Sequence, residues 1–276
     1  MLAVLAAGLV AFLFINGTRS SSALMKEDKS LGHGEKGFDF LSYDKEAKAK
    51  LEPGQKKYLD SLDAVTKVVE TNAAAKAELA GAYDSLGIPA MAAFYYGQLA
   101  QADANNPDYW AKTGDAYFDA QQQVTDSPTF YFFLDKSMEA YDKVLALMPG
   151  NLDVKANQGW NLHVASQGNP EGTMKGVGKL REVLQVNPEH RRALLYMGLL
   201  SLQSNQVGKA IERFEKLTAL PANNDPEYPF YFWYLAEAQM KNKDPEKARQ
   251  ALLTFKSLVK DPRLKEQADA LLLSIH

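Results

Sequence analysis

Apolar residues recur at three- and four-residue steps through most of this chain, with polar and charged residues between them. Around residue 60, for example, Leu59, Leu62 and Val65 fall on one face of a helix. Downstream of that stretch there are neither alternating β-branched runs nor Asn-Gly hairpin signals, so nothing there predicts a strand. The hydrophobic pattern therefore predicts an all-α protein.

The starts of the predicted helices are marked by a recurring dipeptide, in which a capping residue directly precedes a proline. Asn, Ser and Asp side chains accept hydrogen bonds from a first helical turn, and proline fits the first helical position because its missing N–H costs nothing there. Many short helices are therefore expected, and Ser42 is expected to cap another one that ends before Pro53. The seven dipeptides are Asn106-Pro107, Ser127-Pro128, Asn169-Pro170, Asn187-Pro188, Asp225-Pro226, Asp244-Pro245 and Asp261-Pro262.

A small residue returns in a similar frame five times, as in LAGAYDSLG and TGDAYFDAQ. The spacings between these small residues are 34, 45, 39 and 38 residues. The shortest spacing is the length of one helix-turn-helix unit in a known class of helical repeats. The sequence thus indicates a repeat with insertions of different lengths. The five small residues are Ala80, Gly114, Gly159, Gly198 and Ala236.

This pattern resembles the tetratricopeptide repeat (TPR). The second unit shows the resemblance best, with Trp110, Gly114 and Tyr117 at the signature positions of its first helix. Tyr141 and Pro149 occupy the corresponding positions of its second helix and the turn that follows. In such repeats a small residue lets the two helices of a hairpin approach closely, while large residues fill the space between hairpins.

The resemblance implies a right-handed superhelical α-solenoid of about five TPR-like repeats over residues 73–262. Residues 263–276 would then form a capping helix, because the open end of a solenoid exposes apolar surface. Residues 42–72 are expected to form leading helices before the first repeat.

The first eighteen residues, MLAVLAAGLVAFLFINGT, carry no charged side chain and predict an N-terminal hydrophobic helix. Two interpretations remain open: residues 1–18 are an uncleaved transmembrane anchor, or they belong to a signal peptide that is cut after Ala23. The anchor is the favoured interpretation. No basic residue precedes the apolar run, which a natural start upstream of Met1 would explain.

Residues 19–41 are rich in Ser, Gly and Lys and are expected to form a flexible tether. With the anchor, this predicts a membrane-anchored protein whose soluble body lies outside the cytoplasm, in the periplasm. The side of the membrane stays open, because Arg19 follows the apolar run and the positive-inside rule would place the body in the cytoplasm.

The composition excludes several classes of protein. With 46% hydrophobic residues, the chain of 276 residues is too apolar to be disordered throughout. A formal net charge of -3 with scattered basic residues excludes the electrostatic footprint of a nucleic-acid binder. There is no cysteine, which excludes disulfides, thiolate metal sites and a cysteine nucleophile.

No motif in the sequence indicates catalysis. A Gly-rich phosphate loop, a G-x-S-x-G elbow and an H-E-x-x-H pair are all absent, and the four histidines lie far apart. We therefore expect no catalytic residues, cofactor, metal site or small-molecule substrate. Asp115 and Asp119 lie one helical turn apart and could bind a cation or a basic peptide, but such pairs more often form a solvated face.

In proteins that this chain resembles, the first helices of successive repeats line a groove that takes a peptide or a partner helix. Many corresponding positions here carry aromatic or Leu side chains, which favours an apolar groove for a protein partner; packing between hairpins is the alternative. The carboxylate clamp of chaperone-binding relatives is not expected, because Ala77, Ala111 and Ala156 replace its Lys and Asn residues. The predicted groove residues are Asp115, Phe118, Asp119, Trp160, His163, Val164, Leu195, Leu199, Leu202, Trp233, Glu237 and Met240.

The longest insertion adds eleven residues to the second repeat, between Tyr117 and Ser137. Ser127-Pro128 is expected to start the second helix early and to add about two turns to it. Four contiguous aromatic residues there must point around the helix, so we predict that at least one covers the neighbouring hairpin and one is available to a partner. These residues are Phe130, Tyr131, Phe132 and Phe133.

Three functional hypotheses follow from these features. The leading one is a membrane-tethered scaffold that holds a partner subunit or client of an envelope complex in an apolar groove. The alternative is a chaperone-like binder of unfolded or secreted polypeptides, similar to anchored repeat proteins of secretion or cytochrome maturation. An enzyme with a site in the inserted segments is the third and least favoured hypothesis.

Overall fold

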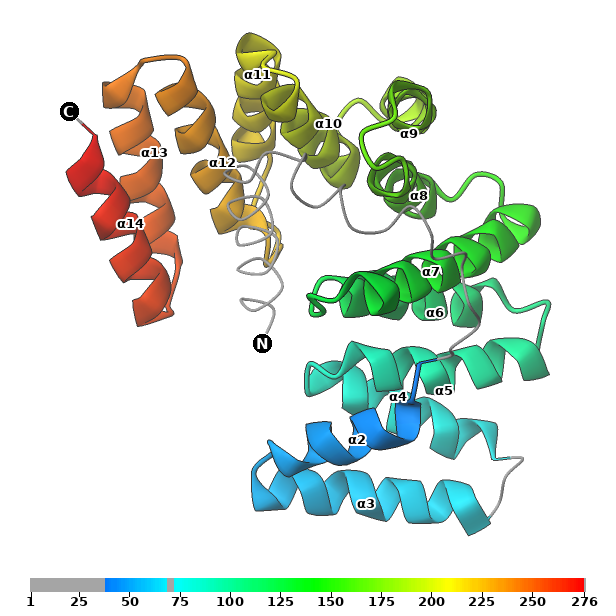
Figure 1. Ribbon diagram of the computed structural model, residues 1–276. Coiled ribbons are helices and arrows are strands. Elements are labelled where there is room, and N and C mark those ends of the chain that lie inside the picture. Colours follow the sequence, from blue (N-terminus) through cyan, green and yellow to red (C-terminus); the bar gives the residue numbers. More distant parts are fainter. Residues whose placement is uncertain (1–37, 69–71, 276) are drawn as a thin grey trace. The chain divides into compact units, whose positions relative to one another are not determined.

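The computed structural model describes residues 38–68 and 72–275, and within them the chain forms thirteen helices and no strand (Figure 1). The all-α prediction is confirmed. The described helices belong to two compact units, Met1–Asn151 and Leu152–His276. The hydrophobic helix predicted at residues 1–18 and most of the predicted tether lie outside the described residues.

In the first unit, each helix from α3 onward packs against the next one in the sequence, and the first helix, α2, contacts α5. The hairpins α4–α5 and α6–α7 are the first and second predicted repeats. Two helices precede them, and the first of these begins inside the stretch predicted to be tether. The helices are α2 (Phe40–Ala49), α3 (Pro53–Val68), α4 (Ala73–Ser85), α5 (Pro89–Ala102), α6 (Pro107–Gln121) and α7 (Ser127–Leu147).

The second unit contains the other three predicted repeats, α8–α9, α10–α11 and α12–α13, and then the predicted capping helix. The cap is held by polar contacts as well as by Leu264 and Ala268, which are buried. Arg249 donates to the carbonyl of Ile275 over 3.0 Å. The helices are α8 (Leu152–Ala165), α9 (Pro170–Val186), α10 (Arg191–Gln203), α11 (Val207–Ala219), α12 (Tyr228–Lys241), α13 (Pro245–Leu258) and α14 (Pro262–Ser274).

Four of the seven capping dipeptides start a helix as predicted. In each, the side chain before the proline accepts a hydrogen bond from a backbone N–H of the first turn, and the proline is the first helical residue. The four capping residues are Asn106, Asn169, Asp244 and Asp261.

Three dipeptides and the Ser42 cap were predicted wrongly. Ser127 is itself helical, because Asp126 caps α7 one residue earlier by accepting from the N–H of Thr129 over 2.9 Å. Likewise, Asp39 rather than Ser42 caps α2 and accepts from the Ser42 N–H over 3.0 Å.

The other two dipeptides open turns instead of helices. After Asn187 the chain makes one turn before α10 begins, and the His190 ring caps that helix by accepting from the N–H of Ala193. After Asp225 a similar turn precedes α12. The side-chain oxygen of Asn187 or Asp225 accepts a hydrogen bond from the N–H two residues on, which stabilises each turn. The same chemistry that caps a helix therefore stabilises a turn here.

Small residues let the helices of a hairpin approach closely, as the sequence predicted. A Cβ atom at Gly114 would lie 2.5 Å from the Tyr141 ring on the partner helix. A Cβ at Gly159 would lie 3.0 Å from the carbonyl oxygen of Gly176. A Cβ at either position would crowd the neighbouring helix, most severely at Gly114.

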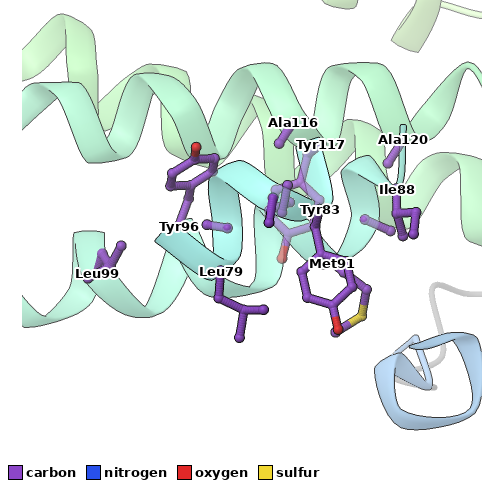
Figure 2. Packing of buried hydrophobic residues seen from close by; sticks show 14 of the residues in the cluster. Leu79, Tyr83, Ile88, Met91, Tyr96, Leu99, Ala116, Tyr117 and Ala120 are labelled. Atoms are coloured by element: carbon purple, nitrogen blue, oxygen red, sulfur yellow. The ribbon is translucent and has the colours of Figure 1, made fainter. Parts of the chain in front are cut away.

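The core of the first unit is a layer of aromatic, Leu and Ala side chains between successive hairpins (Figure 2). Leu79 and Tyr83 of α4 lie at its centre and are fully buried. Tyr117 of α6 reaches the same cluster from the next hairpin. Large side chains thus fill the space between repeats, as in other helical repeat proteins.

A buried lysine joins the leading helices to the first hairpin. Lys48 of α2 is only 7% exposed, and its Nζ atom lies 3.0 Å from Asp44 and 3.4 Å from Asp60. The Tyr83 hydroxyl of α4 donates to Asp44 over 2.6 Å. Since a buried charge without partners would be strongly destabilising, this network fixes α2 and α3 against α4.

Candidate interaction surfaces

The predicted groove residues lie on α6 of the first unit and on α8, α10 and α12 of the second. Five of them are no more than 7% exposed, so the expectation that they are exposed is wrong. The alternative of packing within and between hairpins describes them correctly. The five residues are Trp160, Leu195, Leu199, Leu202 and Trp233.

Aromatic contacts between neighbouring helices explain the burial of the two tryptophans. Trp160 of α8 stacks on Tyr196 of α10 with ring centroids 4.9 Å apart. Trp233 of α12 meets Phe255 of α13 edge to face at 5.1 Å. Large side chains at these positions therefore close interfaces between hairpins, at Trp160, and within a hairpin, at Trp233, rather than face a ligand.

The other predicted groove residues are half-buried and keep part of their surface accessible. Among them, Asp115 accepts a hydrogen bond from the Tyr141 hydroxyl over 2.7 Å. Burial raises the pKa of Glu237 above its usual value, and nearby Lys241 opposes that shift. Their role in partner binding stays a prediction. The seven residues are Asp115, Phe118, Asp119, His163, Val164, Glu237 and Met240.

The eleven-residue insertion lengthens α7 at its front, as predicted, and its aromatic residues divide into two pairs. Phe133 is fully buried and its ring centroid lies 4.7 Å from that of Phe38. Phe132 stacks on Phe38 at 6.2 Å. Two of the four thus cover the start of the leading helices. Phe130 and Tyr131 are half-buried, and their contact with a partner stays a prediction.

A shallow cavity of about 410 Å³ opens beside this aromatic cluster, between the starts of α2 and α7. Phe38, Tyr43 and Phe132 form its apolar wall, while Asp39 and Glu46 supply its charges. The Asp39 carboxylate accepts hydrogen bonds from the N–H and the hydroxyl of Ser42 and thereby caps α2. One of the two charges at this cavity therefore stabilises the helix.

A second cavity, of about 320 Å³, lies in the second unit among α9, α10 and α11, with the end of α8 at its edge. We call it the Arg213 pocket and define it by its lining residues. No pattern in the sequence predicted this pocket. The residues that line it are His163, Thr173, Met174, Val177, Arg181, Met197, Leu200, Ser201, Gln203, Ser204, Gln206, Lys209 and Arg213.

The Arg213 guanidinium is held in place by α10. Its Nη1 atom donates to the Ser201 hydroxyl over 2.5 Å, and Ser201 in turn donates to the Met197 carbonyl over 2.9 Å. Burial lowers the pKa of Arg213 from its ordinary value, neighbouring Glu212 opposes that shift, and the like charge of Arg181 adds to it. A half-buried cation thus lies close to a second cation.

His163 was predicted to be a groove residue, and in the structure it lines the Arg213 pocket. Burial lowers its pKa from the ordinary value of 6.5, and a hydrogen bond with Gln203 opposes the shift. Its Nδ1 atom lies 3.4 Å from the Thr173 hydroxyl. The imidazole is therefore neutral at pH 7 and offers hydrogen bonds rather than charge to the pocket.

A half-buried carboxyl group lies near the start of α12. Burial raises the pKa of Glu227 to about 7, the negative charge of Asp225 adds to this, and Arg192 opposes it. Asp225 itself is engaged by the Tyr231 hydroxyl at 2.9 Å and by Arg191 at 3.2 Å. Glu227 is thus a carboxyl group that takes up a proton near neutral pH.

The described part of the chain contains no group of three or more His, Asp or Glu side chains placed to hold a metal ion. Across residues 38–68 and 72–275, none of the helices combines the length and the apolar character that crossing a membrane requires. The predicted anchor at residues 1–18 lies outside these residues.

The succession of helix hairpins, which within each unit pack on one another through aromatic residues, is the fold of tetratricopeptide-repeat solenoids. A solved TPR protein of Thermus thermophilus shares it with a TM-score of 0.58 and 15% identity, over 73% of this chain and 99% of that one. A tetratricopeptide repeat protein of Parabacteroides merdae gives 0.56 and 13%, over 83% of this chain and 85% of that one. No protein-family model and no curated protein matches the chain.

Proposed function

We propose that the protein is a scaffold that binds another polypeptide along its repeats. The observation that carries this proposal is that three of the first helices keep half-buried side chains at predicted groove positions: Phe118 on α6, His163 on α8 and Met240 on α12. Side chains that are neither fully packed nor fully solvated can gain apolar contact when a partner binds. Helical repeats are well suited to this role, because stacked units create extended surfaces.

The proposal includes a membrane tether. It is supported by the fourteen apolar or Gly residues from Leu2 to Ile15 and by the polar, Ser-rich segment that follows. In this proposal the anchor holds the repeats near an envelope complex, and the scaffold keeps one of its subunits or clients in place. Fractionation of cells that express the full chain, compared with a chain that lacks residues 1–18, tests the tether directly; an equal distribution of the two chains between membrane and soluble fractions would exclude it.

Affinity capture with the full chain tests the scaffold. We expect one or a few proteins to co-purify in fixed stoichiometry, and we expect Glu237→Lys, on the first helix of the fifth repeat, to weaken their capture. Glu246→Lys is the matched control, because it makes the same charge change at an exposed site on α13. Equal capture by both variants would show that the first helices are not the binding surface. Broad capture of unfolded polypeptides would instead support the chaperone-like alternative.

A further inference from the structure

The Arg213 pocket has an unbalanced charge. The charged side chains that line it are Arg181, Lys209 and Arg213, and no carboxylate lines it. Among the described residues, these three form no ion pair within 4 Å. The nearest acidic influence on Arg213 is Glu212, its neighbour on α11. Cations that gather in a depression without a counter-charge create a positive potential there, which favours an anionic ligand.

Arg213 also has hydrogen-bond donors without an acceptor in the described chain. All three of its hydrogen bonds within the described chain come from Nη1, to Ser201, Met197 and Lys209. Its Nε and Nη2 donors have no acceptor there. The contacts of Nη1 fix the planar group, while the other edge is left to donate. Such an edge matches the two oxygens of a carboxylate, and the pair forms two parallel hydrogen bonds.

The uncharged part of the wall is mixed, with polar side chains such as Thr173 and Gln206 beside an apolar portion. Met174 and Val177 of α9 and Met197 and Leu200 of α10 form the apolar portion, and Met174 is 55% exposed. Methionine side chains adapt to ligands of irregular shape. A small inorganic anion would leave this surface uncovered, whereas an acidic residue with an apolar neighbour would cover it.

We propose that the Arg213 pocket binds a Glu or Asp side chain of a partner polypeptide, with an adjacent apolar residue on the exposed Met174. Because the pocket is an open depression among three helices, the partner's chain passes over it. This inference deepens the proposed scaffold function and rests on it, since it gives the chemistry of one segment of the partner.

The test uses the full chain with carbon-13 label in the methionine methyl groups, so that Met174 and Met197 report on the pocket by NMR. The probe is the pentapeptide Gly-Leu-Glu-Leu-Gly, blocked at both ends, and its twin has Gln in place of Glu. We expect saturable shifts of the two methionine signals with the Glu peptide and much weaker binding of the Gln peptide. Equal binding of both peptides would overturn the proposal, because the carboxylate would then contribute nothing.

Substitutions separate the charge from the fold. Arg213→Gln should weaken binding of the Glu peptide by roughly tenfold or more, because it removes a charge-assisted pair of hydrogen bonds. Arg181 is exposed, so Arg181→Gln leaves the packing intact and should weaken binding by about two- to fivefold. Lys216→Gln is the control, as it removes an exposed cation of α11 outside the pocket. Unchanged binding in the Arg181 and Arg213 variants would contradict the proposal.

Two further binding measurements show which kind of anion the pocket takes. If the Gln peptide with a free C-terminus binds as tightly as the blocked Glu peptide, the pocket takes a terminal carboxylate, and the side-chain proposal is wrong. If inorganic phosphate produces the same shifts at the same concentration, the pocket is a general anion site and the peptide proposal is also wrong. In either case capture of a partner by the first helices can still succeed, so the scaffold function is tested separately.

Discussion

Two glycines in the first helices of their hairpins each face an aromatic ring of the second helix, Gly114 against Tyr141 and Gly198 against Phe214. Both rings are fully buried. The regular spacing of small residues in the sequence predicts a small residue at these positions. It does not reveal why Gly114 and Gly198 are glycines, which is that an aromatic ring lies directly against the backbone at each. That requirement comes from the distance between two helices, which no local pattern records.

Gly198→Ala tests this contact. Alanine normally favours a helix over glycine, yet here its Cβ would overlap the Phe214 ring. We expect the free energy of unfolding to fall by about 1–3 kcal/mol, measured by urea denaturation.

Gly178→Ala is the matched control in α9 of the same unit, because no atom lies within 4 Å of a Cβ added there. It should stabilise the protein by about 0.5–1 kcal/mol through helix propensity. If both variants shifted stability in the same direction, the close packing at Gly198 would not be the constraint that the structure indicates.

Glu227 predicts a pH dependence of stability. Its pKa is about 7 in the folded chain and 4.5 ordinarily, so the folded state binds more protons than the unfolded state between these values. The contribution of Glu227 is therefore fully present below about pH 4.5 and is lost as the pH rises to about 7. Since the side chain keeps some exposure, we expect the loss to be about 2 kcal/mol rather than the full shift.

Glu227→Gln removes the titrating group, so the variant should be more stable than the parent at pH 8 and nearly equal to it at pH 4.5. Unfolding midpoints at the two pH values, compared with those of Glu246→Gln at an exposed site on α13, measure this difference. A constant difference between parent and Glu227→Gln across this range would show that Glu227 does not titrate there.

Among the elements, α7 gains its length from the insertion and uses it to hold the start of the chain's described part. The Ser127-Pro128 signal predicted the early start correctly to within one residue, because Asp126 is an equally good cap directly before it. The sequence could not show which of the four aromatic residues are buried. Phe132 and Phe133 pack against the Phe38 ring. Phe38 belongs to a segment that was predicted to be flexible tether.

Phe133→Ala tests this function of α7. The ring packs between Phe38 and Tyr117, and its removal leaves a cavity that should lower the free energy of unfolding by about 3–5 kcal/mol. Proteolysis near α2 should become faster. Leu147→Ala, at the other end of the same helix and 41% exposed, should change stability by less than about 1 kcal/mol. Equal effects of the two substitutions would contradict the assignment.

For the whole chain, the order of helices and the hairpin pairs could be predicted from the sequence, because repeat spacing and capping chemistry are local properties. The Arg213 pocket could not. Its three cations come from two helices, with Arg181 on α9 separated from Lys209 and Arg213 on α11, and only packing brings them to one depression. The five buried groove residues were misplaced for a related reason, since aromatic residues suit an interface between hairpins as well as a binding surface.

The capping helix α14 completes the second unit, and its loss should alter how the molecule associates. Leu264 packs against the last hairpin and is 6% exposed. Leu264→Asp should release α14, expose the apolar side of α13 and cause self-association, measured by light scattering after gel filtration. Leu273→Asp on the outer side of the same helix, which is 80% exposed, should leave the protein unchanged. A monomeric Leu264→Asp variant with full helix content would show that the end needs no cap.

The two glycine–ring contacts also give each unit a spectroscopic marker. A proton that lies against the face of an aromatic ring is shielded by the ring current, so the α-protons of Gly114 and Gly198 should resonate upfield of those of other glycines. Gly114 belongs to the first unit and Gly198 to the second. Loss of one upfield signal before the other during heating would show which unit opens first, without any label or substitution in the chain.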